Sequence, residues 1–256
     1  MIGLNINQIN KISWNKQAER YQQYADFSFD NVDYGDIRCK TEKDLRLLGD
    51  VKGKKILELG CGGANCGIAL AKQGAIVTCT DISEEQIKFA KENARNEEVN
   101  IKFIVSSMED LILGEKEFDI VISVCAMMYV ENIDKVYKNV SHVLKEKGVF
   151  VFSLNDPTFY SIAAKYLWND PVEQQTYFYS GEEKWKWEDN DDFEFITFRR
   201  PISEYINTLS QNGFLMKNFH QLKVNHEQIE NDEEILEALF PRIMVFKAIN
   251  FSDLSI

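Results

Sequence analysis

The segment from Lys54 to Gly67, KKILELGCGGANCG, limits most strongly what this chain can fold into. Its first half is a short apolar run, which is typical of a buried parallel strand. Gly60, Gly62 and Gly63 follow in a turn that opens a helix, and glycine there permits positive φ angles and a close approach to the backbone. The dinucleotide pattern G-x-G-x-x-G is broken, because its last position falls on Asn65. The segment predicts a turn that holds a nucleotide-like ligand against bare backbone.

An acidic residue stands where such a ligand needs one. The apolar run from Ala75 to Thr80 predicts a second strand, and it ends in Asp81. A carboxylate at the tip of this strand is in position to accept hydrogen bonds from both ribose hydroxyls. Ser83 then fits the N-cap of an amphipathic helix that extends to about Asn96. Strand, glycine turn, helix and acidic strand tip therefore follow in the order that a nucleotide site requires.

These features resemble motif I and the acidic strand tip of the class I S-adenosylmethionine (SAM) methyltransferases, in the variant E-L-G-C-G-G that begins at Glu58. The resemblance implies SAM as the cofactor, S-adenosylhomocysteine (SAH) as its product, and no metal. Ser107 stands where the family usually carries an aspartate, so Met108 is the residue expected to pack on adenine. The cofactor-binding residues that the resemblance implies are Glu58, Gly60, Cys61, Gly62, Asp81, Ile82, Ser107, Met108, Glu109 and Ser123.

The same resemblance implies the fold. Further strands are expected at residues 101–105, 118–125, 148–154, from 213 onward, and at 242–249. The implied fold class is α/β, with a Rossmann-like, seven-stranded, mostly parallel sheet, helices on both faces and an antiparallel last strand. The expected regions are an N-terminal helical cap at 1–50, a SAM-binding core at 51–154, a substrate-lid insertion at 155–199, and the C-terminal part of the core sheet at 200–256.

The composition argues against several classes of binding partner. A net charge of −12 argues against nucleic acid, because no basic stripe is present that would displace phosphate counterions. The five cysteines form no CxxC pair, which favours reduced, packed thiols over a metal site. No stretch of the sequence is typical of a transmembrane span or of a secretory signal. A cytoplasmic protein without a membrane partner is therefore expected.

Two aromatic-rich regions outside the core are candidates for the acceptor site. Helix-like segments at 12–25 and 41–48 form a leader whose aromatic residues either cover the cofactor or pack the leader onto the sheet. The aromatic residues of the insertion at 155–199 predict that it covers the substrate pocket with an apolar wall. Within it, strands are expected at 177–180 and 193–198, on either side of an acidic turn at 188–192. The alternative is a solvated acidic hairpin with one packed aromatic face. The substrate-binding candidates are Trp14, Tyr21, Met128, Asp156, Tyr177 and Tyr179. Two further candidates for the lid are Tyr24 and Tyr34. The catalytic candidates are Tyr34, Asp156 and Tyr177.

Asp156 carries the hypothesis about the acceptor. Related methyltransferases often have a His-Pro pair where this chain has Asp156-Pro157. A carboxylate at this point is suited to hold a cationic acceptor, whereas the alternative is a turn residue that caps the following helix. His142, His220 and His226 all fall outside the positions expected of a catalytic base.

The predicted function is methyl transfer from SAM to a nitrogen of a small molecule or of a peptide N-terminus, with a positively charged acceptor. A more specific resemblance is to the bacterial enzymes that dimethylate the N-terminal arginine of azole-containing peptides such as plantazolicin, and it implies a role in natural product biosynthesis. One alternative is a small-molecule O-methyltransferase, and another is a non-catalytic SAM-binding partner protein. An NAD-dependent oxidoreductase is disfavoured by the broken glycine pattern.

Overall fold

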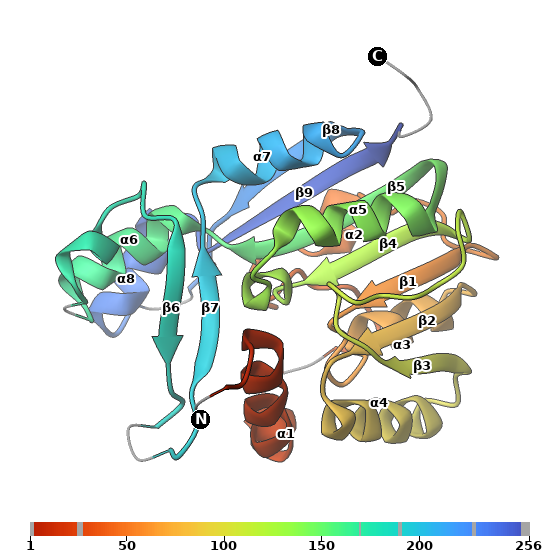
Figure 1. Ribbon diagram of the computed structural model, residues 1–256, viewed down its shortest axis with the longest axis horizontal. Coiled ribbons are helices and arrows are strands. Elements are labelled where there is room, and N and C mark those ends of the chain that lie inside the picture. Colours follow the sequence, from red (N-terminus) through yellow and green to blue (C-terminus); the bar gives the residue numbers. More distant parts are fainter. Residues whose placement is uncertain (1–2, 25–27, 169, 189–190, 227–228, 252–256) are drawn as a thin grey trace.

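The computed structural model describes residues 3–24, 28–168, 170–188, 191–226 and 229–251. At its centre is a seven-stranded sheet in the order β3-β2-β1-β4-β5-β9-β8 (Figure 1). The strands from β3 to β5 pair in parallel, and β9 runs antiparallel to both of its neighbours. The predicted Rossmann-like sheet with an antiparallel last strand is confirmed. The strand bounds are β1 Lys55–Leu59, β2 Ile76–Asp81, β3 Ile101–Val105, β4 Phe118–Val124, β5 Leu144–Asn155, β8 Phe214–Leu222 and β9 Ile243–Asn250.

Helices cover both faces of this sheet, because successive strand residues point to opposite sides. Ile56 belongs to the core beneath α3 and α4, whereas its neighbour Leu57 belongs to the core beneath α5 and α7. Ser83 caps α4 as predicted, and its hydroxyl accepts a hydrogen bond from the N–H of Gln86 at 3.1 Å. The helix bounds are α2 Glu42–Leu45, α3 Asn65–Lys72, α4 Glu84–Asn96, α5 Ile133–Val143 and α7 Ile202–Gln211.

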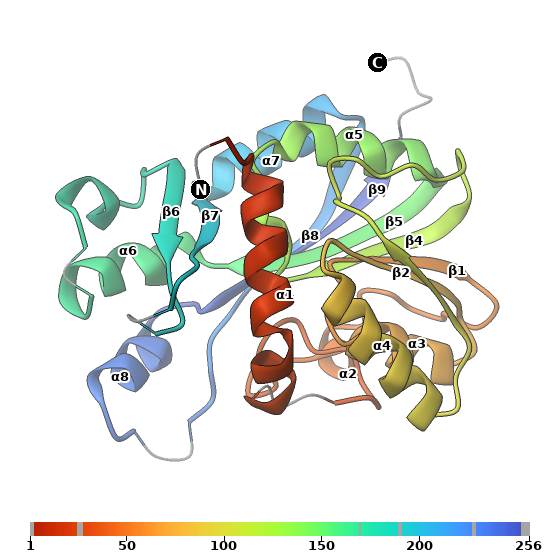
Figure 2. The same ribbon diagram turned by 60° about the horizontal axis from the view of Figure 1, so that its bottom comes forward.

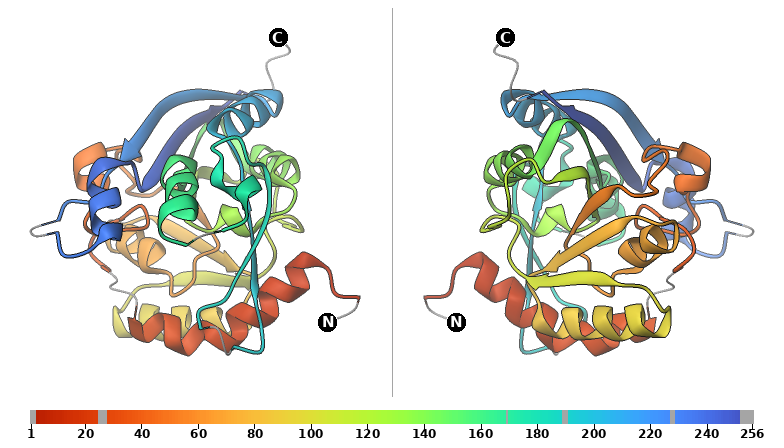
Figure 3. Two further views of the ribbon diagram at one scale, coloured as in Figure 1. Left: turned by 90° about the vertical axis from the view of Figure 1, so that its left-hand side faces the viewer. Right: turned by 90° about the vertical axis from the view of Figure 1, so that its right-hand side faces the viewer.

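A second layer of structure stands over the carboxyl ends of the parallel strands. A long helix, α1, crosses this end of the sheet between α4 and a two-stranded hairpin (Figure 2). Figure 3 shows α1 and α4 lying side by side. The bounds are α1 Ile6–Tyr24, η1 Met127–Tyr129, α6 Pro157–Tyr166, η2 Val172–Gln175, β6 Gly181–Trp185, β7 Phe195–Arg199 and α8 Asp232–Leu239.

Several local predictions need correction. The leader helix begins at Ile6 rather than at residue 12, and the predicted end at residue 25 lies outside the described residues. The hairpin exists, but its first strand is β6 at 181–185, not 177–180. The N–H of Tyr179 bonds to the carbonyl of Thr176 at 3.2 Å, so residues 176–179 form a turn and do not pair as a strand. Residues 189 and 190 of the predicted acidic turn lie outside the described part of the chain.

Two further observations bear on the class of protein. Within the described ranges, no helix is both long enough and apolar enough to cross a membrane. The five cysteines are free thiols, four of them buried and Cys125 half-buried.

Candidate active site

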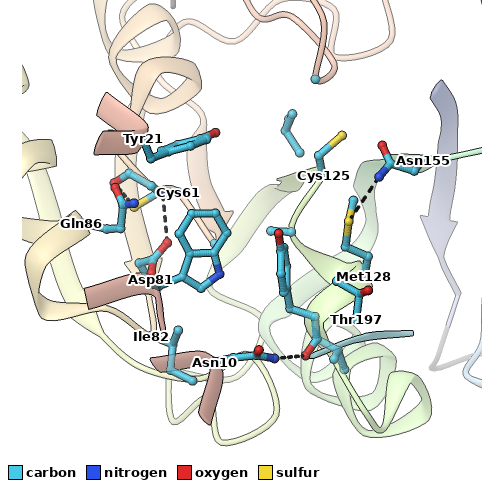
Figure 4. A pocket seen from close by; sticks show the side chains of 18 of the residues that line it. Asn10, Tyr21, Cys61, Asp81, Ile82, Gln86, Cys125, Met128, Asn155 and Thr197 are labelled. Atoms are coloured by element: carbon cyan, nitrogen blue, oxygen red, sulfur yellow. Dashed lines mark hydrogen bonds between the residues drawn. The ribbon is translucent and has the colours of Figure 1, made fainter. Parts of the chain in front are cut away.

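One cavity of about 1160 Å³ opens at the carboxyl ends of β1, β2, β4 and β5, beneath α1 and the hairpin. Carboxyl ends of parallel strands are where open α/β sheets bind their ligands. Pockets for single small molecules typically measure about 300–1,000 Å³. This cavity therefore has room for a cofactor and a second small molecule. Figure 4 shows residues from both of its ends, with Asp81 and Gln86 on one side and Cys125, Met128 and Asn155 on the other.

The glycine turn forms one wall of the cavity. Gly60 and Gly62 have φ angles of 67° and 52°, in the region that favours glycine. A Cβ at Gly60 would lie 2.4 Å from the Cβ of Ala126, so a side chain there would displace the loop after β4. A Cβ at Gly62 would meet nothing closer than Tyr21 at 3.8 Å. The turn therefore presents bare backbone to the cavity, as a bound nucleoside requires.

Asp81 stands beside this turn at the end of β2. Its carboxylate accepts hydrogen bonds from the N–H groups of Gly62 and Ser83, both at 2.9 Å. Burial raises the pKa of Asp81, and these two N–H donors act in the opposite direction by stabilising the ionised form. These two N–H groups hold the side chain in the position predicted for contact with ribose.

Glu58, on β1, lies behind the glycine turn and is 2% exposed. Its Oε2 accepts hydrogen bonds from the N–H of Gly67 at 2.8 Å and from the thiol of Cys79 at 3.3 Å. Burial raises the pKa of Glu58 to about 8, despite these two donors. The side chain thus links β1, β2 and the first turn of α3 beneath the cofactor end of the cavity.

The structure brings together most, but not all, of the predicted cofactor residues. Glu109 and Ser123 do not line the cavity, which corrects the prediction for both. The hydroxyl of Ser123 donates to the carbonyl of Leu59 at 3.0 Å and is fully buried between β4 and β1. The carboxylate of Glu109 accepts from the N–H of Asn132 at 2.8 Å and from the amide of Asn7 at 2.7 Å. The predicted residues that do line the cavity are Glu58, Gly60, Cys61, Gly62, Asp81, Ile82, Ser107 and Met108.

Three of the aromatic and apolar candidates also line the cavity. Trp14 and Tyr21 reach it from α1, and their rings meet edge to face at 5.3 Å between centroids. Trp14 also meets Tyr129 at 5.3 Å, so α1 contacts the loop after β4 through aromatic rings. Met128 lines the side of the cavity away from Asp81, together with Cys125 and Asn155 (Figure 4). We call this side the acceptor end, and the side of Asp81 and the glycine turn the cofactor end. The sulfur of Met128 lies 3.5 Å from the amide nitrogen of Asn155.

Three other tyrosines that were predicted to be catalytic or substrate-binding lie outside the cavity lining. Tyr34 is 1% exposed and donates to Glu42 at 2.5 Å, and burial beside that carboxylate raises its pKa further from neutrality. The hydroxyl of Tyr177 accepts from the N–H of Ile202 at 3.4 Å. The hydroxyl of Tyr179, in the turn before β6, donates to the carbonyl of Glu182 at 2.6 Å. These three side chains pack the structure together, which corrects their predicted roles.

Asp156 needs the same correction. It is the N-cap of α6 and is fully buried. One carboxylate oxygen accepts from the N–H of Thr158 at 2.8 Å, and the other accepts from the amide of Gln221 at 2.7 Å. Both oxygens therefore have partners within the chain, and Asp156 is not part of the cavity lining. The alternative of a helix-capping residue matches this geometry.

Sequence reasoning missed several residues at the acceptor end. The sequence does carry a signal for Asn155, because this residue directly follows the apolar run at 148–154 and precedes Asp156. The amide of Asn155 donates to the hydroxyl of Tyr160 at 2.7 Å. Burial raises the pKa of Cys125 to about 12, so its thiol stays protonated at neutral pH. The lining residues that the sequence analysis did not predict include Asn10, Asp33, Arg38, Cys125, Asn155, Tyr160, Trp168, Glu183 and Arg242.

Sheet order, glycine turn and buried acidic strand tip together define a class I SAM-dependent methyltransferase. The chain belongs to the family described as "Methyltransferase domain", which matches residues 50–191, more than half of its length. SAM is accordingly its cofactor, and the bare turn, the ordered Asp81 carboxylate and the volume of the cavity fit that molecule.

Similar proteins of known sequence agree on this class. A ubiquinone biosynthesis O-methyltransferase from Coxiella burnetii is 34% identical over 124 residues, which cover 46% of this chain and 53% of the relative. An uncharacterised methyltransferase, YbaJ, from Bacillus subtilis is 32% identical over 143 residues, with 55% and 54% covered. The chain spans about half the length of the curated relatives it matches.

Solved structures show the same fold over most of the chain. A SAM-dependent methyltransferase from Mesorhizobium loti has a TM-score of 0.67 and 25% identity, and the match covers 80% of this chain and 95% of that one. Magnesium protoporphyrin IX methyltransferase from Synechocystis, with bound SAH, has a TM-score of 0.62 at 14% identity, and covers 96% of this chain and 100% of that one. At such low identity the second likeness concerns the fold alone.

Proposed function

We propose that this methyltransferase transfers the methyl group of SAM to an oxygen atom of a small molecule bound at the acceptor end of the cavity. The observation that carries the proposal is a single cavity shared by the cofactor residues and by Cys125, Met128 and Asn155. A cofactor and an acceptor in one cavity would be positioned for direct transfer between them.

The residues at the cofactor end suggest how SAM is held. The backbone of Gly60 to Gly63 would lie against the nucleoside, Asp81 would accept from the ribose hydroxyls, and Ile82 and Met108 would pack against adenine. Bound SAM supplies a methyl group on a positively charged sulfur, so the reaction needs little further activation. The chain's contribution is alignment of the two reactants, which supplies up to about 7–11 kcal/mol of a barrier in favourable cases.

Two arguments favour oxygen over nitrogen. The prediction of a cationic acceptor depends on Asp156. Its two carboxylate oxygens accept hydrogen bonds from Thr158 and Gln221, and the residue does not line the cavity. Arg38 and Arg242 line the cavity, and a guanidinium group suits an acceptor that carries an ionised oxygen. Because Arg38 is paired with Asp36, Arg242 is the residue that supports this argument. The O-methyltransferase activity named for the Coxiella relative is in line with this choice.

A nitrogen of a small molecule or of a peptide N-terminus remains the second candidate. Its support is a pair of carboxylates, Asp33 and Glu183, that also line the cavity and are suited to a cation. Glu183 is already paired with Arg199 at 2.9 Å, which weakens that support.

The test is methyl transfer from SAM labelled with tritium in its methyl group. Acceptors are offered in three sets: phenols and hydroxy acids, primary amines, and short peptides that begin with arginine. The proposal expects labelled products from the first set, with the methyl group on oxygen by mass spectrometry. Products confined to nitrogen acceptors would overturn it in favour of the second candidate. Tight SAH binding without transfer to any set would instead favour a non-catalytic SAM-binding protein.

A further inference from the structure

Arg242 occupies a fixed position at the acceptor end of the cavity. It directly precedes β9, and its N–H donates to the carbonyl of Leu222 at 2.8 Å while its own carbonyl accepts from the N–H of Asp156 at 3.0 Å. Asn155 and Ile243 are paired in the adjoining strands, so Arg242 stands at the carboxyl end of β5. Its side chain lines the cavity and remains 21% exposed.

The guanidinium of Arg242 is oriented by aromatic rings. It lies over Phe159 at 4.4 Å and near Tyr160 at 5.2 Å, measured to the ring centroids. Its Nε lies 3.3 Å from Glu237, which fixes the rotation of the planar group. Aromatic stacking together with one ion pair holds a guanidinium in a single orientation, which reduces the entropy lost when it binds a ligand.

This guanidinium has hydrogen-bonding capacity left. Among the described residues, its Nη1 has no hydrogen-bond partner, although the atom is buried. Buried N–H groups without partners are costly, and a ligand oxygen that reached this group would remove that cost. The guanidinium of Arg38 differs from that of Arg242, because its Nε and Nη2 donate hydrogen bonds to Asp36 at 3.0 and 2.6 Å.

Three of the acidic groups near this guanidinium are engaged by other residues. Asp36 is held by Arg38, and Glu183 is held by Arg199. Glu237 is shared, since it lies 3.5 Å from Arg38 and 3.0 Å from Nε2 of His226 as well as 3.3 Å from Arg242. Its carboxylate therefore does not serve Arg242 alone.

The wall beside Arg242 is aromatic. Tyr160 and Trp168 line the cavity together, with ring centroids 5.4 Å apart. The hydroxyl of Tyr160 is fixed by the amide of Asn155 at 2.7 Å. An acceptor whose carboxylate reached Arg242 would place its apolar, aromatic body against these two rings, which meet edge to face.

We infer that Arg242 binds a carboxylate of the acceptor, so that the enzyme acts on aromatic acids and selects them against their neutral and cationic analogues. This inference rests on the proposed function, because it names the class of acceptor for the same cavity. Arg242 is then a substrate-binding residue that anchors the acceptor through a charge-assisted hydrogen bond.

The experiment measures binding to the SAH-saturated protein, independently of turnover. Three probes share a phenol and differ only in the group opposite to it: 4-hydroxybenzoate, 4-hydroxybenzamide and 4-hydroxybenzylamine. Ligand-observed NMR titration at millimolar concentrations is expected to give the tightest binding for the acid, by at least about tenfold over the amide, as loss of a charged hydrogen bond predicts.

Arg242→Met should bring the acid-to-amide ratio close to one while leaving SAH affinity unchanged within about twofold, a difference of less than 1 kcal/mol. Arg242→Lys, which keeps the charge without the planar fork, should retain part of the preference. Arg95→Met, on the exposed face of α4, removes one positive charge elsewhere and should leave the ratio as in the wild type.

Three results would overturn the inference: an unchanged ratio in Arg242→Met, tighter binding of the amide or the amine, or binding of none of the probes to protein that is saturated with SAH. Failure to bind SAH at all would instead contradict the proposed function, so the two failures are distinguishable.

Discussion

Asn10 of α1 and Ile196 of β7 are joined by two hydrogen bonds of 2.8 Å, one in each direction. The side-chain amide of Asn10 donates to the carbonyl of Ile196, and its Oδ1 accepts from the N–H of the same residue. The amide also lies 3.3 Å from the carbonyl of Tyr129. One buried side chain thus ties the helix over the cofactor end to the hairpin over the acceptor end.

Asn10→Ala should loosen this connection. The substitution leaves the backbone groups of Ile196 buried without partners, at a cost of about 1–3 kcal/mol in the free energy of unfolding. Chemical denaturation measures the loss, and hydrogen exchange at the Ile196 amide reports its location. Glu19→Ala, on the exposed side of α1, is the control. Unchanged exchange at Ile196 would show that this pair does not hold the hairpin.

Asp156→Ala should reduce stability but not catalysis. Loss of the cap leaves the N–H of Thr158 and the amide of Gln221 without their acceptor, and N-cap removal typically costs about 0.5–2 kcal/mol. Asp156→Asn retains an oxygen for the cap and should be milder. The measurement is thermal unfolding together with kcat/KM. A fall in kcat/KM with wild-type stability would revive Asp156 as a substrate residue.

Glu58 predicts a pH dependence of stability. Its pKa is about 8 in the folded protein and close to the ordinary value of 4.5 in the unfolded chain, so between these values the folded state holds a proton that the unfolded state has released. The unfolded state binds fewer protons, and this group's contribution to the free energy of unfolding therefore falls as pH rises from 4.5 to 8 and then levels off.

Glu58→Gln removes that titration. Relative to the wild type, its free energy of unfolding should improve steadily as the pH rises from 5 toward 8. Urea denaturation at several pH values measures the difference between the two proteins. A difference that stays constant across this range would mean that Glu58 is ionised throughout in the folded state.

The glycine turn and the acidic end of β2 could be predicted because each is specified by a short stretch of sequence. Gly60, Gly62 and Asp81 act through the backbone conformation and strand ends where they stand, and a short stretch of sequence specifies both. The start of α1 was missed because Asn10 and Ser13 are polar yet buried, so they break the apolar periodicity that marks a helix. Their partners lie in β7 and before it, more than 180 residues away.

The acceptor half depends on contacts that the sequence does not bring together. Arg242 was recognised only as the start of a strand, and its role emerges where α6, α8 and β9 meet around Phe159 and Glu237. The prediction for Asp156 was wrong because its hydrogen-bond partners are distant or hidden in the sequence. Its position at the end of β5 was correct, but Thr158 and Gln221 direct its carboxylate away from the cavity.

Calorimetric titration with SAH tests the central claim most directly, in the wild type, in Asp81→Ala and in the shape-conserving Asp81→Asn. The account predicts a dissociation constant raised by well over about tenfold in Asp81→Ala, because hydrogen bonds to a charged group contribute about 1.5–3 kcal/mol each. Asp110→Ala, an exposed acid paired with Lys135, serves as the control and should bind SAH as the wild type does. Unchanged SAH affinity in both folded Asp81 variants would contradict the assignment of this cavity as the SAM site.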